Sequence, residues 1–125
     1  MSQTRFAKSH EWVRLDGDVA TIGISDHAQS ALGDVVFVEL PESGREVEAG
    51  EAVAVVESVK AASDVYAPIA GTVASANAAL VDNPALVNSD AMGEGWFFTI
   101  TPRDKADLEA LMDADAYEKH VESEG

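Results

Sequence analysis

The chain has 125 residues, of which 46% are hydrophobic, and this length predicts one domain over residues 1–125 that buries a hydrophobic core. The formal net charge of -15 argues against nucleic acid and anionic membranes as partners, because both bind clustered lysine and arginine. The chain has no cysteine, which excludes disulfides, thiolate metal sites and cysteine nucleophiles, so any sulfur chemistry must come from a cofactor.

A hairpin and a short helix are predicted at the start of the chain. Val13–Leu15 and Val19–Ile24 are expected to be strands, and between them the Asp-Gly-Asp sequence at 16–18 suits a tight reversal. The next segment, Ser25–Leu32, is predicted to be a helix because serine is a favoured cap. Gly33 follows directly and is expected to end that helix.

Short strands separated by turn residues are predicted along the middle of the chain. β-Branched and aromatic residues favour strands, and the proline and glycine residues between them end strands. Many short strands with close turns are typical of a sandwich or barrel. The predicted strands are Val35–Leu40, Glu46–Val47, Ala52–Ser58, Ala62–Tyr66, Gly71–Ala76 and Trp96–Thr101.

The carboxyl-terminal part is predicted to be helical. Residues 104–112 are expected to form a helix with Asp104 as its cap, because apolar side chains share one helical face at Leu108, Leu111 and Met112. Asp113 is expected to cap one or two further turns through Val121, after which the acidic end frays.

The amino-terminal segment MSQTRFAKSHEW has no apolar stretch that would mark a secretory signal. No run approaches the roughly 18 to 20 apolar residues that span a bilayer. We therefore expect a soluble cytoplasmic protein. The acidity leaves two interpretations open: a solvated shell suited to a high-salt cytoplasm, or an acidic docking face for partner enzymes.

Lys60 stands apart from the other lysines, because Lys8, Lys105 and Lys119 lie near the chain ends. It lies between two predicted strands and is followed by small residues, which predicts a hairpin tip. A lysine there extends a flexible stem, and its amine can be acylated. The same pattern fits an ordinary solvated lysine, since no Asn-Gly or Asp-Gly pair marks the turn.

The segment ESVKAASDVYAPIAG resembles the lipoyl-attachment segment of glycine cleavage H proteins, with Lys60 at the modified position. The stretches SHEWVR, VATIGISDHAQSALGDVVFVELPESG, DNPALVNSD, GEGWFFTI and AYEKH resemble the same family in the same order. The resemblance implies a mainly β fold, the barrel-sandwich hybrid of lipoyl and biotinyl domains. The implied fold has two antiparallel sheets, a short inserted helix, carboxyl-terminal helices and Lys60 at an exposed turn.

The resemblance implies a carrier protein and not an enzyme. Lipoate, joined by an amide to Lys60, would carry the aminomethyl group of glycine from the pyridoxal-phosphate glycine decarboxylase (P protein) to the tetrahydrofolate-dependent aminomethyltransferase (T protein). Dihydrolipoyl dehydrogenase (L protein) would then reoxidise the arm, and a lipoate ligase or a lipoyl or octanoyl transferase would attach it. Because the chain lacks cysteine, the carrier itself offers no thiol that could attack the arm by disulfide exchange.

By the same resemblance, Glu57 and Gly71 contribute to recognition by the lipoylating enzymes. Glu57 also fits a plain surface charge at a strand end. Gly71 also has two structural interpretations: close backbone approach in a strand or, with fewer assumptions, a turn after Pro68.

The resemblance further implies that Ser9, Glu11 and Asp64 surround a cleft that holds the loaded arm. The aminomethyl group ends in a cationic amine, and carboxylates can hold such an amine by charge-assisted hydrogen bonds. Glu11 and Asp64 are suited to this role, although both also belong to a set of 23 acidic residues.

Three alternatives remain open at this point. A biotin carrier typically has methionines beside its lysine, whereas Val59 and Ala61 flank Lys60. A lipoyl domain of a 2-oxoacid dehydrogenase typically has an aspartate just before its lysine, and a protein that relays lipoate to such enzymes is a related possibility. The third alternative is an interaction module whose Lys60 is never modified.

Histidine and tryptophan residues are expected to have structural roles. His10, His27 and His120 fall in different predicted elements without the spacing of a metal site, so each is expected to pack or to lie on the surface. Trp12 and Trp96 are expected in the core.

Overall fold

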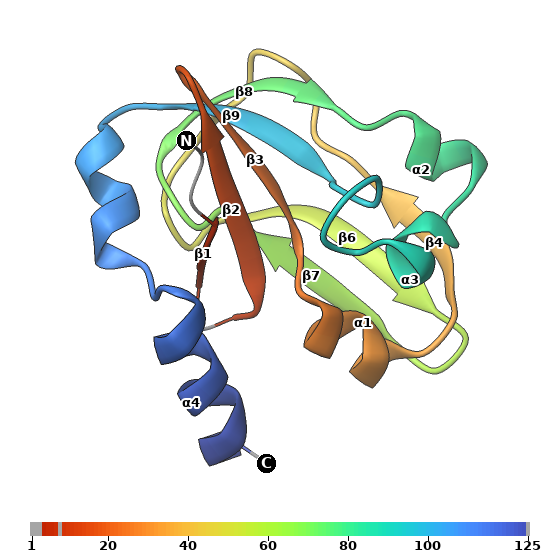
Figure 1. Cartoon of the computed structure of the whole chain (residues 1–125). Coiled ribbons are helices and arrows are strands. Elements are labelled where there is room, and N and C mark those ends of the chain that lie inside the picture. The colour runs from red at the N-terminus through yellow and green to blue at the C-terminus, as the bar shows by residue number, and fades with distance from the viewer. Residues whose placement is uncertain (1–3, 8, 125) are drawn as a thin grey trace.

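The computed structural model describes residues 4–7 and 9–124. Its strands are β1 (Thr4–Phe6), β2 (Glu11–Asp16), β3 (Val19–Ile24), β4 (Val35–Glu39), β5 (Glu46–Val47), β6 (Ala52–Ser58), β7 (Ala62–Tyr66), β8 (Gly71–Ala76) and β9 (Phe98–Pro102). They form a six-stranded sheet in the order β1-β2-β3-β9-β8-β5 and a three-stranded sheet in the order β4-β6-β7 (Figure 1). All pairings are antiparallel, so the predicted mainly β fold with two antiparallel sheets is confirmed.

Short helices connect and flank the sheets in the described part of the chain. They are α1 (Asp26–Leu32), α2 (Ala79–Asp82), α3 (Leu86–Ser89), a 3-10 helix (Lys105–Ala110) and α4 (Ala114–Glu124). The Ser25 hydroxyl accepts a hydrogen bond from the Ala28 N–H, which caps α1 as predicted. None of the described helices is long and apolar enough to cross a membrane.

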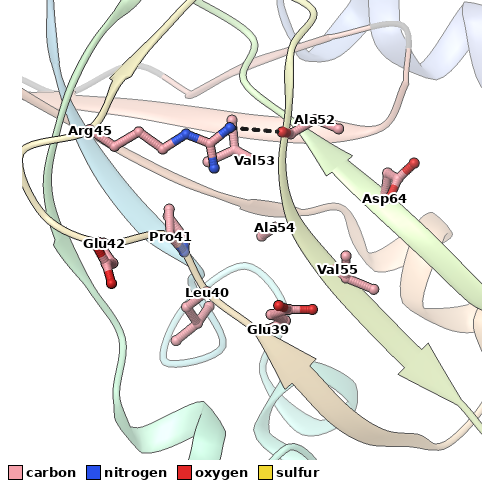
Figure 2. A pocket seen from close by; sticks show the side chains of 10 residues that line it. All are labelled: Glu39, Leu40, Pro41, Glu42, Arg45, Ala52, Val53, Ala54, Val55 and Asp64. Carbon is pink, nitrogen blue, oxygen red and sulfur yellow. Dashed lines mark hydrogen bonds between the residues drawn. The ribbon is translucent and has the colours of Figure 1, made fainter.

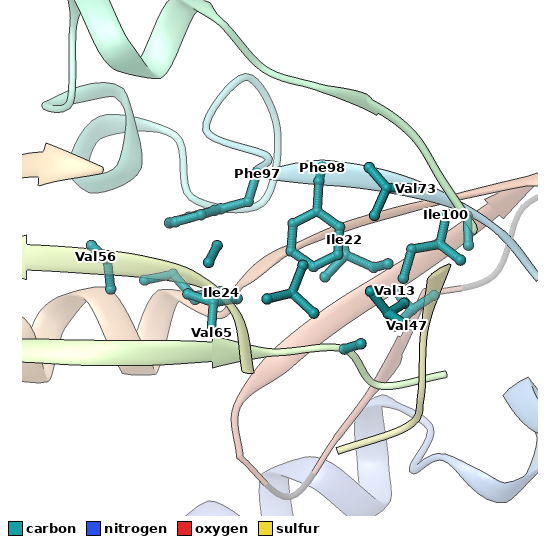
Figure 3. Close-up of a cluster of buried hydrophobic side chains, with 14 of the residues drawn as sticks. Val13, Ile22, Ile24, Val47, Val56, Val65, Val73, Phe97, Phe98 and Ile100 are labelled. Atoms are coloured by element: carbon teal, nitrogen blue, oxygen red, sulfur yellow. The ribbon is translucent and has the colours of Figure 1, made fainter. Parts of the chain in front are cut away.

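The main core joins the two sheets. Val13, Ile22 and Phe98 of the larger sheet share one buried cluster with Val56 and Val65 of the smaller sheet, and all five are at most 1% exposed (Figure 3). Burying a side chain of this size stabilises the fold by about 1.5–3 kcal/mol. The packing of Val56 and Val65 in this core therefore fixes the position of the β6–β7 hairpin, to which both residues belong.

A second cluster attaches α4 to the start of the chain. The rings of Phe6 and Tyr117 are stacked with their centroids 4.3 Å apart, and Trp12 is fully buried beside them. The backbone of Met112 pairs with that of Phe6 through hydrogen bonds of 2.8 and 2.9 Å. The expectation of a core role is confirmed for Trp12, whereas Trp96 is only partly buried against this cluster.

The carboxyl-terminal prediction needs two corrections. The helix expected over 104–112 is a 3-10 helix that ends at Ala110, because Leu111 is extended and Met112 pairs with β1. The last helix does not fray after Val121 but continues to Glu124.

Other differences concern short elements. The strand expected from Trp96 begins at Phe98, since the Trp96 carbonyl accepts a hydrogen bond from the side chain of Asn77. β1, α2 and α3 were not predicted. They have only three or four residues each, and neither helix has a side-chain cap that a sequence could reveal.

Candidate functional site

Lys60 lies at the tip of the β6–β7 hairpin, and its side chain is exposed. The Ser58 hydroxyl accepts hydrogen bonds from the N–H groups of Lys60 (3.2 Å) and Ala61 (3.1 Å) and donates to the Ala61 carbonyl (3.1 Å). The Val59 N–H donates to the Asp34 carbonyl at 3.0 Å. The tip is therefore closed by a serine instead of an Asn-Gly pair, and it is held to the loop before β4.

The stem of Lys60 lies across the end of α1. A Cβ atom added at Gly33 would lie 3.0 Å from the Lys60 Cε and 3.6 Å from its Nζ. Gly33 has φ +81°, a conformation that glycine adopts without strain, and its N–H donates to the Gln29 carbonyl. Glycine at this position thus ends α1 and also leaves room for the lysine stem.

A cavity of about 220 Å³ lies along α1 between the two sheets. One part of its wall is apolar, formed by Ile24, Ala28, Ala31, Leu32 and Val56. The polar part is formed by Ser9, His10, Glu11, Ser63 and Asp64. The structure therefore brings together three residues that the resemblance implies for one cleft: Ser9, Glu11 and Asp64.

Glu11 is the buried carboxyl of this cavity, with 1% of its surface exposed. One carboxyl oxygen accepts a hydrogen bond from the Ser9 hydroxyl, and the other accepts one from the Tyr66 N–H at 3.2 Å. Burial raises the pKa of Glu11 to about 7, although both hydrogen bonds act in the opposite direction. This carboxyl therefore changes charge near neutral pH.

Replacing Glu11 with glutamine is expected to remove a pH dependence of stability. Because the folded state holds the proton of Glu11 more tightly than the unfolded state does, the free energy of unfolding falls as pH rises from 4.5 to about 7. The expected fall is about 3 kcal/mol. Urea unfolding of both proteins at pH 4.5 and pH 8 measures the difference. If the free energy of unfolding changed by the same amount between pH 4.5 and pH 8 in both proteins, the shift could not be assigned to Glu11.

Asp64 is exposed on β7, opposite Val55 of β6, where it lines the cavity and also a second hollow. That hollow is an open groove of about 470 Å³ on the three-stranded sheet. Figure 2 shows the Arg45 guanidinium in it, bonded to the Ala52 carbonyl at 3.4 Å. Arg45 also pairs with Glu51 at 2.7 Å. Asp64 is the predicted site residue that lines both the groove and the cavity.

Glu57 and Gly71 occupy different parts of the fold. Glu57 is half-buried on β6, opposite Ala62 and beside the tip. Gly71 lies in the other sheet, where it pairs with Val47 and Pro102. In Figure 1 the start of β8 and the β6–β7 turn lie on opposite sides of the molecule. The structure therefore does not bring Gly71 to Lys60.

A close approach explains glycine at position 71. A Cβ atom there would lie 2.2 Å from the Thr101 carbonyl oxygen and 2.6 Å from the Ile100 Cγ2. Gly71 lies within β8 and has no positive φ. The interpretation as a turn glycine is therefore wrong, and the interpretation as close backbone approach is confirmed.

Histidines from three segments of the chain lie together beside the cavity, which the sequence did not indicate. The ring centroid of His10 lies 5.0 Å from that of His27 on α1 and 5.8 Å from that of His120 on α4. The His10 Nδ1 and the Tyr117 hydroxyl are 2.7 Å apart. No spacing pattern could predict this cluster, because it depends on where α4 packs.

Comparisons with known proteins point to one family. Residues 4–124 match the model of the family described as glycine cleavage H-protein. The glycine cleavage system H protein of Acidiphilium cryptum is 70% identical over 94% of this chain and 95% of its own length. A glycine cleavage system H protein of Thermus thermophilus is 59% identical over 95% of this chain and 93% of its own. The crystal structure of a glycine cleavage system H protein from Mycobacterium marinum superposes with a TM-score of 0.88 at 36% identity, covering 96% of this chain and 97% of the other.

Proposed function

Because this chain belongs to the glycine cleavage H-protein family, we propose that Lys60 is its lipoyl attachment site and that the cavity along α1 receives the arm. The protein is a non-catalytic lipoyl carrier of the aminomethyl group in glycine cleavage, and its partners are the P, T and L proteins of that system. The observation that carries the proposal is the exposed lysine on a fixed tip, with its stem lying across the end of the helix that lines the cavity.

The residues near Lys60 fit a lipoyl arm. Asp64 on β7 follows Lys60 by four residues, so the two lie at most about 13 Å apart at the rise of a strand. The lysine stem and an acyl chain can span that distance. Ala28, Ala31 and Leu32 offer an apolar wall to the chain, and the polar groups lie where a charged end would arrive. Bound lipoate supplies a disulfide that accepts the aminomethyl group and two electrons.

The cavity residues are proposed to hold the cationic amine of the cargo. Asp64 and Glu11 offer carboxyl groups, and Ser9 orients the Glu11 carboxyl through its hydroxyl. A cation beside Glu11 favours its ionised form, so the pKa of Glu11 should fall when the cargo arrives. Glu11 would then release its proton as the amine enters, and the ion pair would form away from bulk water.

The lipoylating enzyme, a ligase or a lipoyl or octanoyl transferase, is proposed to approach the hairpin tip. Glu57 presents a carboxylate beside that tip and is suited to a basic enzyme surface. Gly71 is proposed to act only through the fold, by allowing β8 and β9 to pair. We further propose that residues 1–125 act as one domain in the cytoplasm.

Reconstitution tests the proposed function. The lipoylated chain is mixed with the three partner enzymes, and release of carbon dioxide from glycine is measured. We expect release to rise with the concentration of the lipoylated chain and to stay at background with the unlipoylated chain. Equal rates with both forms would contradict the proposal.

Replacing Asp64 with asparagine is expected to leave lipoylation intact and to shorten the time for which the cargo is held. The amide keeps the size of the carboxylate but loses the charge that pairs with the amine, which predicts release about 1.5- to 5-fold faster for an exposed pair. A time course of trapped formaldehyde measures release. Asp82→Asn, on α2, is the control. A lifetime equal to that of the unsubstituted protein would remove Asp64 from this role.

A further inference from the structure

The segment that carries Ser9 and Glu11 has an unusual backbone conformation. His10, the residue between them, has φ 77°, and it is the only non-glycine residue with positive φ in the described part of the chain. A side chain disfavours this conformation, so other contacts must hold it. Ser9, His10 and Glu11 all line the cavity, and their positions depend on those contacts.

Backbone hydrogen bonds hold His10 at both sides. Its N–H donates to the Ala7 carbonyl at 3.0 Å, and its carbonyl accepts the Ser25 N–H at 2.8 Å. The ring is held separately, by the bond of 2.7 Å between the His10 Nδ1 and the Tyr117 hydroxyl. The Tyr117 contact comes from a distant part of the chain, 107 residues away.

The Tyr117 hydroxyl makes a second hydrogen bond, of 2.6 Å, to the Ser25 hydroxyl. Ser25 caps α1, whose residues Ala28 and Leu32 form the apolar wall of the cavity. One oxygen atom is therefore bonded to both walls: to the polar wall through His10 and to the helical wall through Ser25. Tyr117 is 7% exposed and reaches this place from α4.

We propose that the Tyr117 hydroxyl is a positioning group that, together with the backbone bond from Ser25 to His10, sets the spacing between the two walls of the cavity, so that α4 contributes to how tightly the cavity closes. The part of this inference that concerns the cargo rests on the proposed function. The part that concerns the spacing of the walls rests on the contacts alone. The ring of Tyr117 has a separate structural role, because it stacks on Phe6 at 4.3 Å. Tyr117→Phe keeps that stack and removes only the hydroxyl.

The pKa of the Glu11 carboxyl reports on the spacing between the two walls of the cavity. The carboxyl is buried because the Ser9–Glu11 segment lies against β7 and α1, and burial is the largest cause of its raised pKa. If the segment moves away from α1, water reaches the carboxyl and its pKa falls toward 4.5. The other titratable groups nearby are Asp64 in the cavity and the imidazoles of His10, His27 and His120.

The test compares Tyr117→Phe with the unsubstituted protein, both without lipoate. A carbon-13 NMR titration follows the Glu11 carboxyl, and circular dichroism checks that the fold is kept. We expect the Glu11 pKa to fall in Tyr117→Phe and to stay unchanged in Lys119→Gln, which alters an exposed neighbour on the same helix. An unchanged Glu11 pKa in Tyr117→Phe overturns the positioning role.

Ser25→Ala breaks the same bridge from its other end. Because Ser25→Ala also removes the cap of α1, the comparison is made in that background: if the hydroxyl acts through Ser25, adding Tyr117→Phe to Ser25→Ala lowers the Glu11 pKa no further. Additive shifts would contradict a single bridge.

A second measurement uses the lipoylated, loaded protein. We expect Tyr117→Phe to release the cargo about 2- to 10-fold faster, the effect of one hydrogen bond. A lowered Glu11 pKa with unchanged release upholds the positioning role and counts instead against the use of this cavity in the proposed function.

Discussion

Lys60→Arg is expected to reduce glycine decarboxylation in the reconstituted system to the rate measured without a carrier. Arginine keeps the positive charge and most of the length of the side chain, but its guanidinium cannot form the lipoyl amide. Lys60 is exposed and forms no part of the core, so the fold should be unaffected. Substitutions of this kind usually change the free energy of unfolding by less than about 0.5 kcal/mol.

Lys119→Arg is the matched control for this prediction, because Lys119 is also exposed but lies on α4. It should carry lipoate and support the full rate. Thermal unfolding of both variants separates loss of attachment from loss of fold. Activity retained by Lys60→Arg would refute attachment at this lysine.

Gly71→Ala is expected to destabilise the protein by about 2–3 kcal/mol through overpacking. The added methyl group would lie 2.2 Å from the Thr101 carbonyl oxygen, so β8 and β9 must move apart in the six-stranded sheet. The obstacle is backbone and cannot change its rotamer. Urea unfolding measures the loss, and Thr72→Ala, the next residue of β8, is the control with a smaller expected effect.

The same variant decides how Gly71 contributes to lipoylation. If it acts through the fold, folded Gly71→Ala is lipoylated at the rate of the unsubstituted protein when measured well below its melting temperature. If Gly71→Ala is folded under the assay conditions but is not lipoylated, the lipoylating enzyme instead recognises Gly71 directly.

Local features were predictable from the sequence where a short motif determines them. Ser25 and Gly33 mark the two ends of α1, and both make the predicted cap contacts. The tip at Lys60 was less clear, because it has no Asn-Gly or Asp-Gly pair and is closed by Ser58 instead. A serine before the turn can bond the next backbone N–H groups, and this signal was present in the sequence.

Long-range features of the site could not be predicted in the same way. Tyr117 bonds Ser25 and His10 across 92 and 107 residues, and no local pattern encodes such pairs. The raised pKa of Glu11 depends equally on burial by segments distant in the chain. Family resemblance supplied Ser9, Glu11 and Asp64 as one group, but it did not indicate that α4 supports them.

The most direct test of lipoyl attachment is the mass of the peptide that contains Lys60, isolated from cells that make this protein. We predict that this peptide carries one lipoyl group, and that peptides containing the other lysines carry none. A biotinyl group on Lys60, an unmodified Lys60 in cells that lipoylate other proteins, or lipoate on another lysine would contradict the proposed carrier role of Lys60.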